Sequence, residues 1–407
     1  MTAAEDHQRI ADKRLALPEF TAMLAMLFAT LAFSIDAMLP ALPAIAAELT
    51  PDAVNHAQLI LTAFVLGMGV GTLLAGPISD SVGRKPAIAG GMLLYVIGAA
   101  IAHYANSIEM LLAARVIQGL GAAGPRIVGM ALTRDLYEGR EMARVMSFVM
   151  LVFMIVPAAA PAVGAGIIAF SGWRGVFLAF IVFGLTALAW VSIRQIETLP
   201  KDKRRALSVK NLKDSVREVL GDRDVRIYTA VMSLGFGQMF ALLSTIQPIF
   251  DETYGRAASF PLWFALIAVV SASASVINSR FVMHLGMRYL ASIAYLGQAV
   301  LSVVVLIIIA SGVLSGWMAF AAFFLWANSI FFIAGLTFGN LNALALQKMG
   351  HIAGMANSII TAIATVAAVL IAGPVGQLFN GTAIPAIMGA ALCSTMAYLL
   401  LRRTLPS

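Results

Sequence analysis

Charged residues are scarce in this chain. Asp, Glu, Lys and Arg make up 12% of its 407 residues and hydrophobic types make up 60%, whereas soluble domains carry roughly 25% charged residues. So little charge excludes a soluble globular protein. Because a membrane-spanning helix needs about 20 apolar residues, the length accommodates about twelve such helices joined by short loops. The composition therefore predicts an all-α polytopic membrane protein.

Cysteine is nearly absent, and histidine clusters and nucleotide-binding loops are missing. The single cysteine, Cys393, excludes an internal disulfide and a cysteine-based metal cluster. The five histidines fall at expected helix ends or loops without ligand spacing, so neither a metal site nor an enzyme is expected. No glycine-rich loop ends in Lys followed by Ser or Thr, which argues against ATP as an energy source. We expect no cofactor, and an ion gradient remains as the driving force.

The net charge of +7 follows a pattern along the chain. Most of the 27 Lys and Arg residues fall in segments that short loops place on the same side as the N-terminal tail. Cytoplasmic loops of membrane proteins carry an excess of Lys and Arg. The positive net charge therefore indicates how the chain is oriented in the membrane and does not indicate a nucleic-acid partner. The tail, with three acidic and three basic residues, does not resemble a cleaved signal peptide. We expect both termini in the cytoplasm and the protein in the inner membrane.

Hydropathy and charge divide the chain into two six-helix pseudo-repeated halves. The first helix is expected at about 18–46, a tight loop at 81–84, and the fifth and sixth helices at 142–170 and 173–194. A charged linker follows, within which 207–219 has the spacing of an amphipathic surface helix. A weak echo of Gly83-Arg84 in the second half, Gly286-Met287-Arg288, favours an internal repeat. The predicted parts are a tail (1–17), a first half (18–195), a linker (196–226), a second half (227–402) and a C-terminal tail (403–407).

One carboxylate interrupts the first hydrophobic run. Asp36 lies within the stretch from Leu27 to Ile45, which is otherwise apolar. A charge in hydrocarbon costs several kcal/mol by estimates that differ widely, so such residues usually face a cavity or a partner. The simpler alternative is solvation near the outer mouth of the helix, which Pro40 and Pro43 permit. We favour a functional role for Asp36.

Two arginines lie inside the expected fourth helix. Arg115 and Arg126 are eleven residues apart, which leaves them about 20° apart around the helix axis. Gln118 and Gly119 share this general face. Such a stripe indicates a cavity lining or a tight helix contact. For Arg126 a substrate contact, snorkelling toward lipid and a structural ion pair all stay open.

The loop after the second helix carries the most specific local pattern, Gly76-Pro77-Ile78-Ser79-Asp80-Ser81-Val82-Gly83-Arg84-Lys85-Pro86. It resembles the signature loop of the major facilitator superfamily, although the family pattern has Arg where this chain has Ser81. Gly83 permits a chain reversal and Asp80 can pair at a helix end. The resemblance implies a conformational-switch loop formed by Gly76, Asp80, Gly83, Arg84, Lys85, Arg134 and Asp135.

Further stretches resemble the drug:proton antiporter branch of this superfamily, in particular its bicyclomycin-resistance (Bcr/CflA) group. They are Ile35–Pro43, Ala114–Gly119, Thr133–Tyr137, Pro157–Gly164, Gly339–Leu346 and Gly350–Asn357. The resemblance implies a proton-coupling role for Asp36 and Arg115, which we expect to lie near each other. It also implies an exporter motif at Pro157, Pro161 and Gly164, where the prolines predict a bend and the glycine a close helix contact.

Aromatic and amide side chains supply a candidate substrate pocket. Each apolar member has a simpler interpretation, namely packing between helices or against lipid. Met239, Gln247, Asn278 and Asn342 are secondary candidates. The expected substrate-binding set is Phe33, Asp36, Arg115, Gln118, Arg126, Phe236, Gln238, Phe240, Trp263, Trp326 and Asn340.

Together these features predict a proton-coupled secondary exporter of an amphipathic small molecule, working by alternating access as a monomer in the lipid bilayer. One alternative is a proton-coupled uptake symporter of a small anionic metabolite, with Arg115 and Arg126 as its anion site. Another is a membrane sensor or scaffold of the same fold that does not transport. The sequence names neither the substrate nor the proton stoichiometry.

Overall fold

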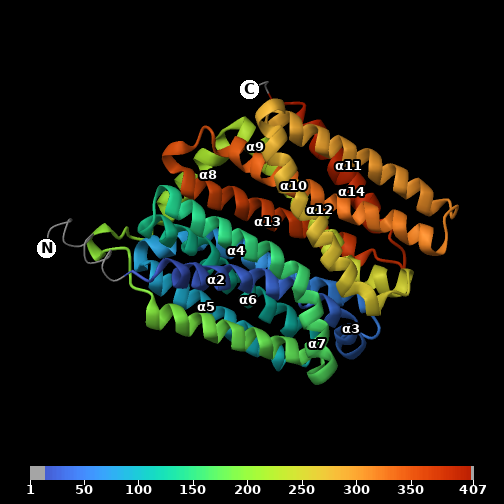
Figure 1. Ribbon diagram of the computed structural model, residues 1–407, viewed down its shortest axis with the longest axis horizontal. Coiled ribbons are helices and arrows are strands. Elements are labelled where there is room, and N and C mark those ends of the chain that lie inside the picture. The colour runs from blue at the N-terminus through green and yellow to red at the C-terminus, as the bar shows by residue number, and fades with distance from the viewer. Residues whose placement is uncertain (1–13, 405–407) are drawn as a thin grey trace.

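The computed structural model describes residues 14–404, and all regular structure in that range is helical. Figure 1 shows the long helices running roughly side by side. The α-helices are α2 (Leu17–Asp36), α3 (Leu42–Leu49), α4 (Leu59–Val82), α5 (Arg84–His103), α6 (Ile108–Leu136), α7 (Gly139–Arg194), α8 (Val209–Gly221), α9 (Arg223–Pro248), α10 (Phe260–Leu285), α11 (Met287–Ala310), α12 (Gly316–Leu346), α13 (Ala353–Gln377) and α14 (Ile384–Leu401).

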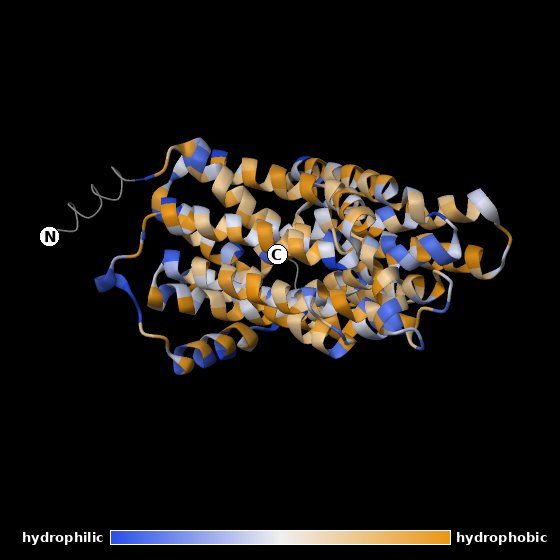
Figure 2. Ribbon diagram, turned by 90° about the horizontal axis from the view of Figure 1, so that it is seen from below, coloured by the Kyte–Doolittle hydropathy of each residue, from blue (hydrophilic) through white to orange (hydrophobic). Residues whose placement is uncertain are grey.

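These helices make twelve crossings. Ten stretches within the described residues are long and apolar enough to span a membrane, α2 and α3 together counting as one. The stretch that contains α7 is broken at Gly172, whose φ of 67° is not helical, and so provides two crossings. The remaining crossing is α6, whose hydropathy is lowered by its arginines. Figure 2 shows hydrophobic residues along the length of the bundle and hydrophilic ones mainly toward its two ends. The twelve-helix fold predicted from composition is confirmed.

The crossings form two groups. Figure 1 shows α2 and α4–α7 together on one side and α9–α14 on the other, with α4 packed along α13 and α7 against α10. We call the end where α2 begins and α8 lies the linker end, and the other the opposite end. The limits 18–195 and 227–402 for the two halves remain our proposal.

Two local predictions need correction. The first helix is not continuous over 18–46, because α2 ends at Asp36 and a turn and a short 3₁₀ segment (Leu39–Ala41) separate it from α3. Pro40 and Pro43 lack the backbone N–H that a continuous helix needs, which explains the break. The tight loop at 81–84 is shorter than expected, since α4 continues to Val82 and Gly83 alone reverses the chain at φ 111°.

Two other local predictions are confirmed. The helix pair at 142–170 and 173–194 corresponds to the two parts of α7 on either side of Gly172. The amphipathic linker helix expected at 207–219 is α8.

Hydrogen bonds join the two groups of helices at the opposite end. The side-chain amide of Asn55 donates to the backbone carbonyls of Gln377 (3.1 Å) and Phe379 (2.7 Å). The side chain of Gln377 donates in return to the carbonyl of Asn55 at 2.7 Å. We call this reciprocal set the Asn55 latch. It joins the short helix Val54–Gln58, which precedes α4, to the end of α13.

Candidate functional site

Asp36 is the last residue of α2, and 5% of its surface is exposed. Its carboxyl group makes no hydrogen bond and no ion pair with any residue in the range 14–404. The next residue, Ala37, lies against α7, because a Cβ on Gly164 would collide with the Ala37 carbonyl oxygen. Glycine at position 164 therefore lets α7 approach the break in the first crossing. The predicted exporter motif and the predicted acid meet at this point.

Arg115 is fully buried, as its position within the fourth crossing predicts, but its partners do not include Asp36. Its guanidinium donates to the carbonyl of Ser34 (3.0 Å), to the carbonyl of Ile60 (3.4 Å) and to Oε1 of Gln118 (2.7 Å). It also lies 4.3 Å from the ring centre of Phe64. Carbonyl dipoles and the ring face thus compensate the charge.

No ion pair within 4 Å joins Asp36 to Arg115 in the described chain, so these two groups, which we expect to lie near each other, are not paired in this structure. The reason is the direction of the side chains. Ser34, whose hydroxyl contacts the Tyr95 hydroxyl at 2.6 Å, lies two residues before Asp36 on α2. Two residues correspond to about 200° around a helix, so the two side chains point to opposite faces. Arg115 lies on the Ser34 side.

The stripe around Arg115 is a tight helix contact. A Cβ on Gly119 would collide with the Phe64 carbonyl oxygen, and one on Gly67 would collide with the Val116 carbonyl oxygen. The backbones of α4 and α6 therefore touch, which only glycine allows. The sequence left open a cavity lining or a tight helix contact, and Arg115 and Gln118 lie in a tight helix contact.

Arg126 differs from Arg115. Its side chain is half-buried and has no hydrogen-bond or ion-pair partner among residues 14–404. Gly129, about 60° away around α6, faces Leu24 and Phe28 of α2. This side of α6 is therefore turned toward the neighbouring helix and not toward lipid. The structure shows no ion pair for Arg126 among those residues, and it leaves a cation available on the inner side of the first half.

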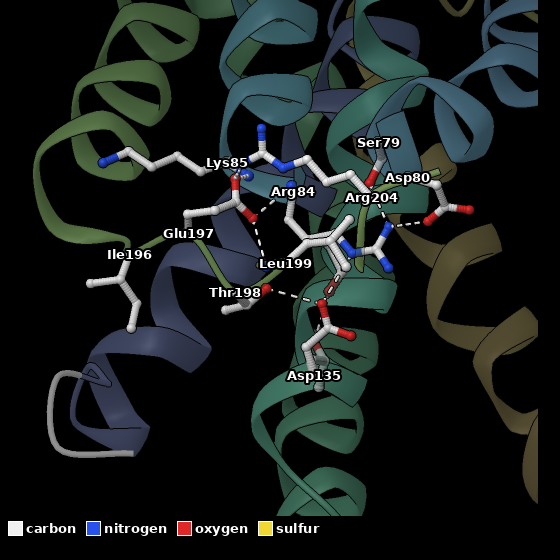
Figure 3. Close-up of polar contacts among 12 residues, drawn as sticks. Ser79, Asp80, Arg84, Lys85, Asp135, Ile196, Glu197, Thr198, Leu199 and Arg204 are labelled. Atoms are coloured by element: carbon white, nitrogen blue, oxygen red, sulfur yellow. Dashed lines mark hydrogen bonds and ion pairs between the residues drawn. The ribbon is translucent and has the colours of Figure 1, made fainter. Parts of the chain in front are cut away.

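A polar network surrounds Gly83 at the linker end (Figure 3). The Arg84 guanidinium contacts Oδ1 of Asp80 (2.5 Å), Oγ of Ser79 (2.8 Å) and Oδ2 of Asp135 (3.0 Å). Thr198 of the linker donates to the same Asp135 oxygen at 2.9 Å. Asp80, Arg84 and Asp135, which the sequence assigns to one loop system, are thus brought together.

Glu197, which no sequence motif singled out, completes this network. Its carboxylate accepts from the backbone N–H groups of Arg84 (2.9 Å) and Lys85 (3.2 Å), the first two residues of α5. A negative charge here compensates the positive end of the helix dipole. A Cβ on Gly83 would lie 2.8 Å from Cδ of Glu197 and 2.9 Å from Nη2 of Arg204. Glu197 is one of six acids in the linker, so no local signal in the sequence distinguished it.

The linker is attached to both groups of helices. The N–H of Arg205 donates to the Asp80 carbonyl at 2.9 Å, which ties the start of the linker to α4. At the other end of the linker, Glu218 contacts His351 at 2.6 Å, just before α13. The linker covers a cavity of about 540 Å³ between the two groups. Arg134 is exposed in the wall of this cavity, which also includes Gly76, Asp80 and Arg84.

Most of the expected pocket residues serve helix packing. Trp326 is fully buried and donates to Ser302 Oγ at 2.9 Å, and Trp263 packs within a cluster of aromatic rings. Asn340 donates to Asn278 at 2.7 Å, and Gln238 accepts from Ser394 at 2.8 Å. None of the aromatic candidates lines the 540 Å³ cavity. In this conformation Trp263 and Trp326 line no part of that cavity, and their role in binding stays a prediction.

The three remaining aromatic candidates also contact other rings. Phe33 packs against Phe180 and Phe183, with ring centres 5.4 and 5.6 Å apart. Phe236 lies against Phe338 at 4.4 Å and near Phe240 at 6.2 Å. These three residues fill the contacts between helices of their own half in this conformation.

Twelve crossings in two groups, a membrane-buried acid and a polar network at one end are the features of a membrane transporter. Residues 22–372 match the Major Facilitator Superfamily, and the chain belongs to this family of transporters, which are not enzymes.

Relatives of the chain include bicyclomycin- and chloramphenicol-resistance proteins, the group that the motifs predict. The chain is 32% identical to a bicyclomycin resistance protein homolog of Haemophilus influenzae, over 90% of this chain and 92% of that protein. It is 31% identical to a chloramphenicol resistance protein of Pseudomonas aeruginosa, over 60% and 57% of the two chains. It is 30% identical to the multidrug resistance protein MdtL of Escherichia coli, over 59% and 61%.

Solved structures of low identity share the fold. The xylose transporter XylE from E. coli, in a partially occluded inward open conformation, superimposes with a TM-score of 0.72 at 13% identity, over 96% of this chain and 98% of that chain. The human organic anion transporter MFSD10 gives 0.69 at 17% identity, over 95% and 100%.

Proposed function

We propose that this protein is a proton-coupled exporter of amphipathic small molecules. The observation that carries the proposal is Asp36, a membrane-buried carboxyl group without a partner in the described chain, placed where Gly164 contacts the break in the first crossing. A charged carboxylate without compensation is costly in a membrane, and taking up a proton removes that charge. The names of the drug-resistance relatives support the same activity.

We place the protein in the inner membrane with both termini and the linker end in the cytoplasm. The bias of basic residues toward that end supports this orientation. Transport then proceeds by alternating access between the two six-helix halves. The Asn55 latch closes the outer end, while the 540 Å³ cavity lies at the cytoplasmic end. We propose a monomer without a cofactor, driven by the proton gradient.

Export is expected in a direct test of direction. Cells that express the protein should accumulate less of at least one toxic amphipathic compound, because an inward proton flow drives the compound outward. Accumulation is measured with a panel of fluorescent compounds. As a control, a protonophore should restore accumulation to that of cells without the protein. Accumulation that rises with expression would contradict export.

The Asn55 latch gives a second expectation. Asn55→Ala removes two hydrogen bonds between the halves, which at about 1 kcal/mol each shifts the equilibrium toward an open outer end by about thirtyfold. A thiol reagent added from outside should then label a cysteine at the buried position 57 faster, in a protein whose Cys393 is replaced by alanine. Asn380→Ala is the matched control, since Asn380 lies at the same end and bonds only Thr382. Equal labelling in the two variants would exclude the latch.

Uptake of a small anion is the second candidate, and Arg126 favours it. An unpaired cation on the inner side of α6 suits a carboxylate or phosphate group. The two functions differ in direction, so the accumulation measurement separates them.

A further inference from the structure

Four arginines gather at the linker end of the second half. Arg223 and Arg226 begin α9, and Arg402 and Arg403 follow α14. All four side chains are exposed, and none lies within 4 Å of a carboxylate in the described part of the chain. We call these residues the arginine cluster. Four cations that share one patch and pair with no carboxylate in the described chain repel one another, so the patch favours an anion.

The acids of the neighbouring segment are engaged elsewhere. Lys348 donates to the carboxylates of Asp224 (3.0 Å) and Asp222 (3.3 Å), and these hydrogen bonds, first the one to Asp224, raise the pKa of Lys348. Glu218 contacts His351. Asp222 and Asp224 therefore share Lys348, and Glu218 is engaged by His351, so none of these carboxylates contacts the arginine cluster.

A hollow of about 230 Å³ lies directly beneath the arginine cluster. Its walls are Arg223, Arg226, Ile227, Ala230, Leu400 and Arg403. The four residues from α9 have the spacing i, i+3, i+4 and i+7, which places them on one face of the helix. The hollow is therefore a groove between α9 and α14, with cations at the helix ends and apolar side chains one to two turns deeper.

The arginines retain free donors. One Nη2–H of Arg223 reaches the carbonyl of Arg403 at 3.5 Å, and Nη1 of Arg226 reaches the carbonyl of Leu220 at 3.2 Å. A guanidinium has five N–H donors, so each of these two keeps several for a ligand. These contacts hold the side chains in place without neutralising their charge.

The polarity of the groove distinguishes between ligands. Both α9 and α14 cross the membrane, so their ends lie at the level of the lipid headgroups. On α14, Leu392, Met396 and Leu399 are exposed along the length of the helix, as expected of a surface that faces acyl chains. A soluble anion would need the cations but not the apolar floor. A molecule with a phosphate at one end and a hydrocarbon chain at the other matches both parts.

We infer that the groove between α9 and α14 is a binding site for an anionic phospholipid of the leaflet at the linker end. The phosphate contacts Arg223, Arg226 and Arg403, and an acyl chain lies on Ile227, Ala230 and Leu400. This site is separate from Asp36 and from the cavity under the linker, so it does not depend on what the protein transports.

The test is lipid binding to the full-length protein in detergent, followed by native mass spectrometry. Phosphatidylglycerol should bind more tightly than phosphatidylcholine with identical acyl chains. Each arginine is worth about fivefold, so the double variant Arg226→Gln/Arg403→Gln should lose about 25-fold in affinity for phosphatidylglycerol. Arg140→Gln/Arg144→Gln is the matched control, with two exposed arginines removed at the same end of the protein but away from the groove; it should change binding less than twofold.

Four results would overturn the inference. The first is an equal loss in both double variants, which would indicate general surface charge. The second is equal binding of the two lipids by the wild-type protein. The third is displacement of the bound lipid by millimolar inorganic phosphate, which would indicate a soluble anion. A further variant, Arg226→Lys/Arg403→Lys, keeps the charge and should retain most of the affinity; a loss as large as that of the glutamine variant would also reject the site.

Discussion

Asp36→Asn is expected to abolish proton release on substrate binding. Asparagine has nearly the same size and keeps an oxygen acceptor, but it cannot give up a proton. Because Asp36 has no partner in the described chain, the substitution breaks no ion pair and should leave the fold and part of the substrate affinity intact. The measurement is the pH change of a weakly buffered solution of detergent-solubilised protein when substrate is added.

The matched control for this experiment is Asp251→Asn. Asp251 lies at the opposite end of the second half, beyond α9, and is partly exposed. The Asp251→Asn variant should release protons as the wild-type protein does. A wild-type signal from Asp36→Asn would show that another group carries the proton. Substrate binding measured in parallel distinguishes lost coupling from lost affinity.

Gly83→Val is expected to reduce transport by more than tenfold while leaving the protein in the membrane. Two causes act together. The backbone at φ 111° and ψ 161° is essentially restricted to glycine, and a β-branched residue there costs about 1–3 kcal/mol. A Cβ would also collide with the Glu197 carboxyl group that binds the start of α5. The Glu197 carboxyl group must shift to relieve this collision, which disturbs its contacts with the N–H groups of Arg84 and Lys85, while the backbone strain remains.

Transport in sealed vesicles, divided by the amount of protein in the membrane, measures this effect. Gly90→Val is the control, because Gly90 lies on the same helix α5, is exposed, and a Cβ added there would have no neighbouring atom within 4 Å. It should transport like the wild type. Full activity of Gly83→Val would reject a role for this turn in the conformational switch.

Local chemistry made much of the fold predictable. Apolar length predicted the crossings. The break that divides α2 from α3 was missed, although the two prolines after Asp36 are local signals for it. Gly83 was predicted at a reversal because only glycine adopts its backbone angles without strain, and the structure has it there. These features depend on a few neighbouring residues, so the sequence is sufficient for them.

The parts of the site that were missed depend on distant contacts. Counting residues gave the depth of Asp36 and Arg115 along their helices but not the direction of each side chain. Glu197 lies 113 residues from Arg84 in the chain, and nothing local shows that the linker returns there. Trp326 was nominated for its residue type alone, which does not distinguish a cavity wall from a buried contact with Ser302.

The two attachments of the linker also set a limit on movement. Between Arg205, bound to the Asp80 carbonyl, and Val209, where α8 begins, only three residues lack helical structure. Fully extended, this piece spans about 14 Å. The two halves can separate at this end only until this segment is fully extended. Wider opening requires the contact of Arg205 with Asp80 or that of Glu218 with His351 to break. The length of a loop outside the membrane therefore limits how far this end opens while both contacts hold.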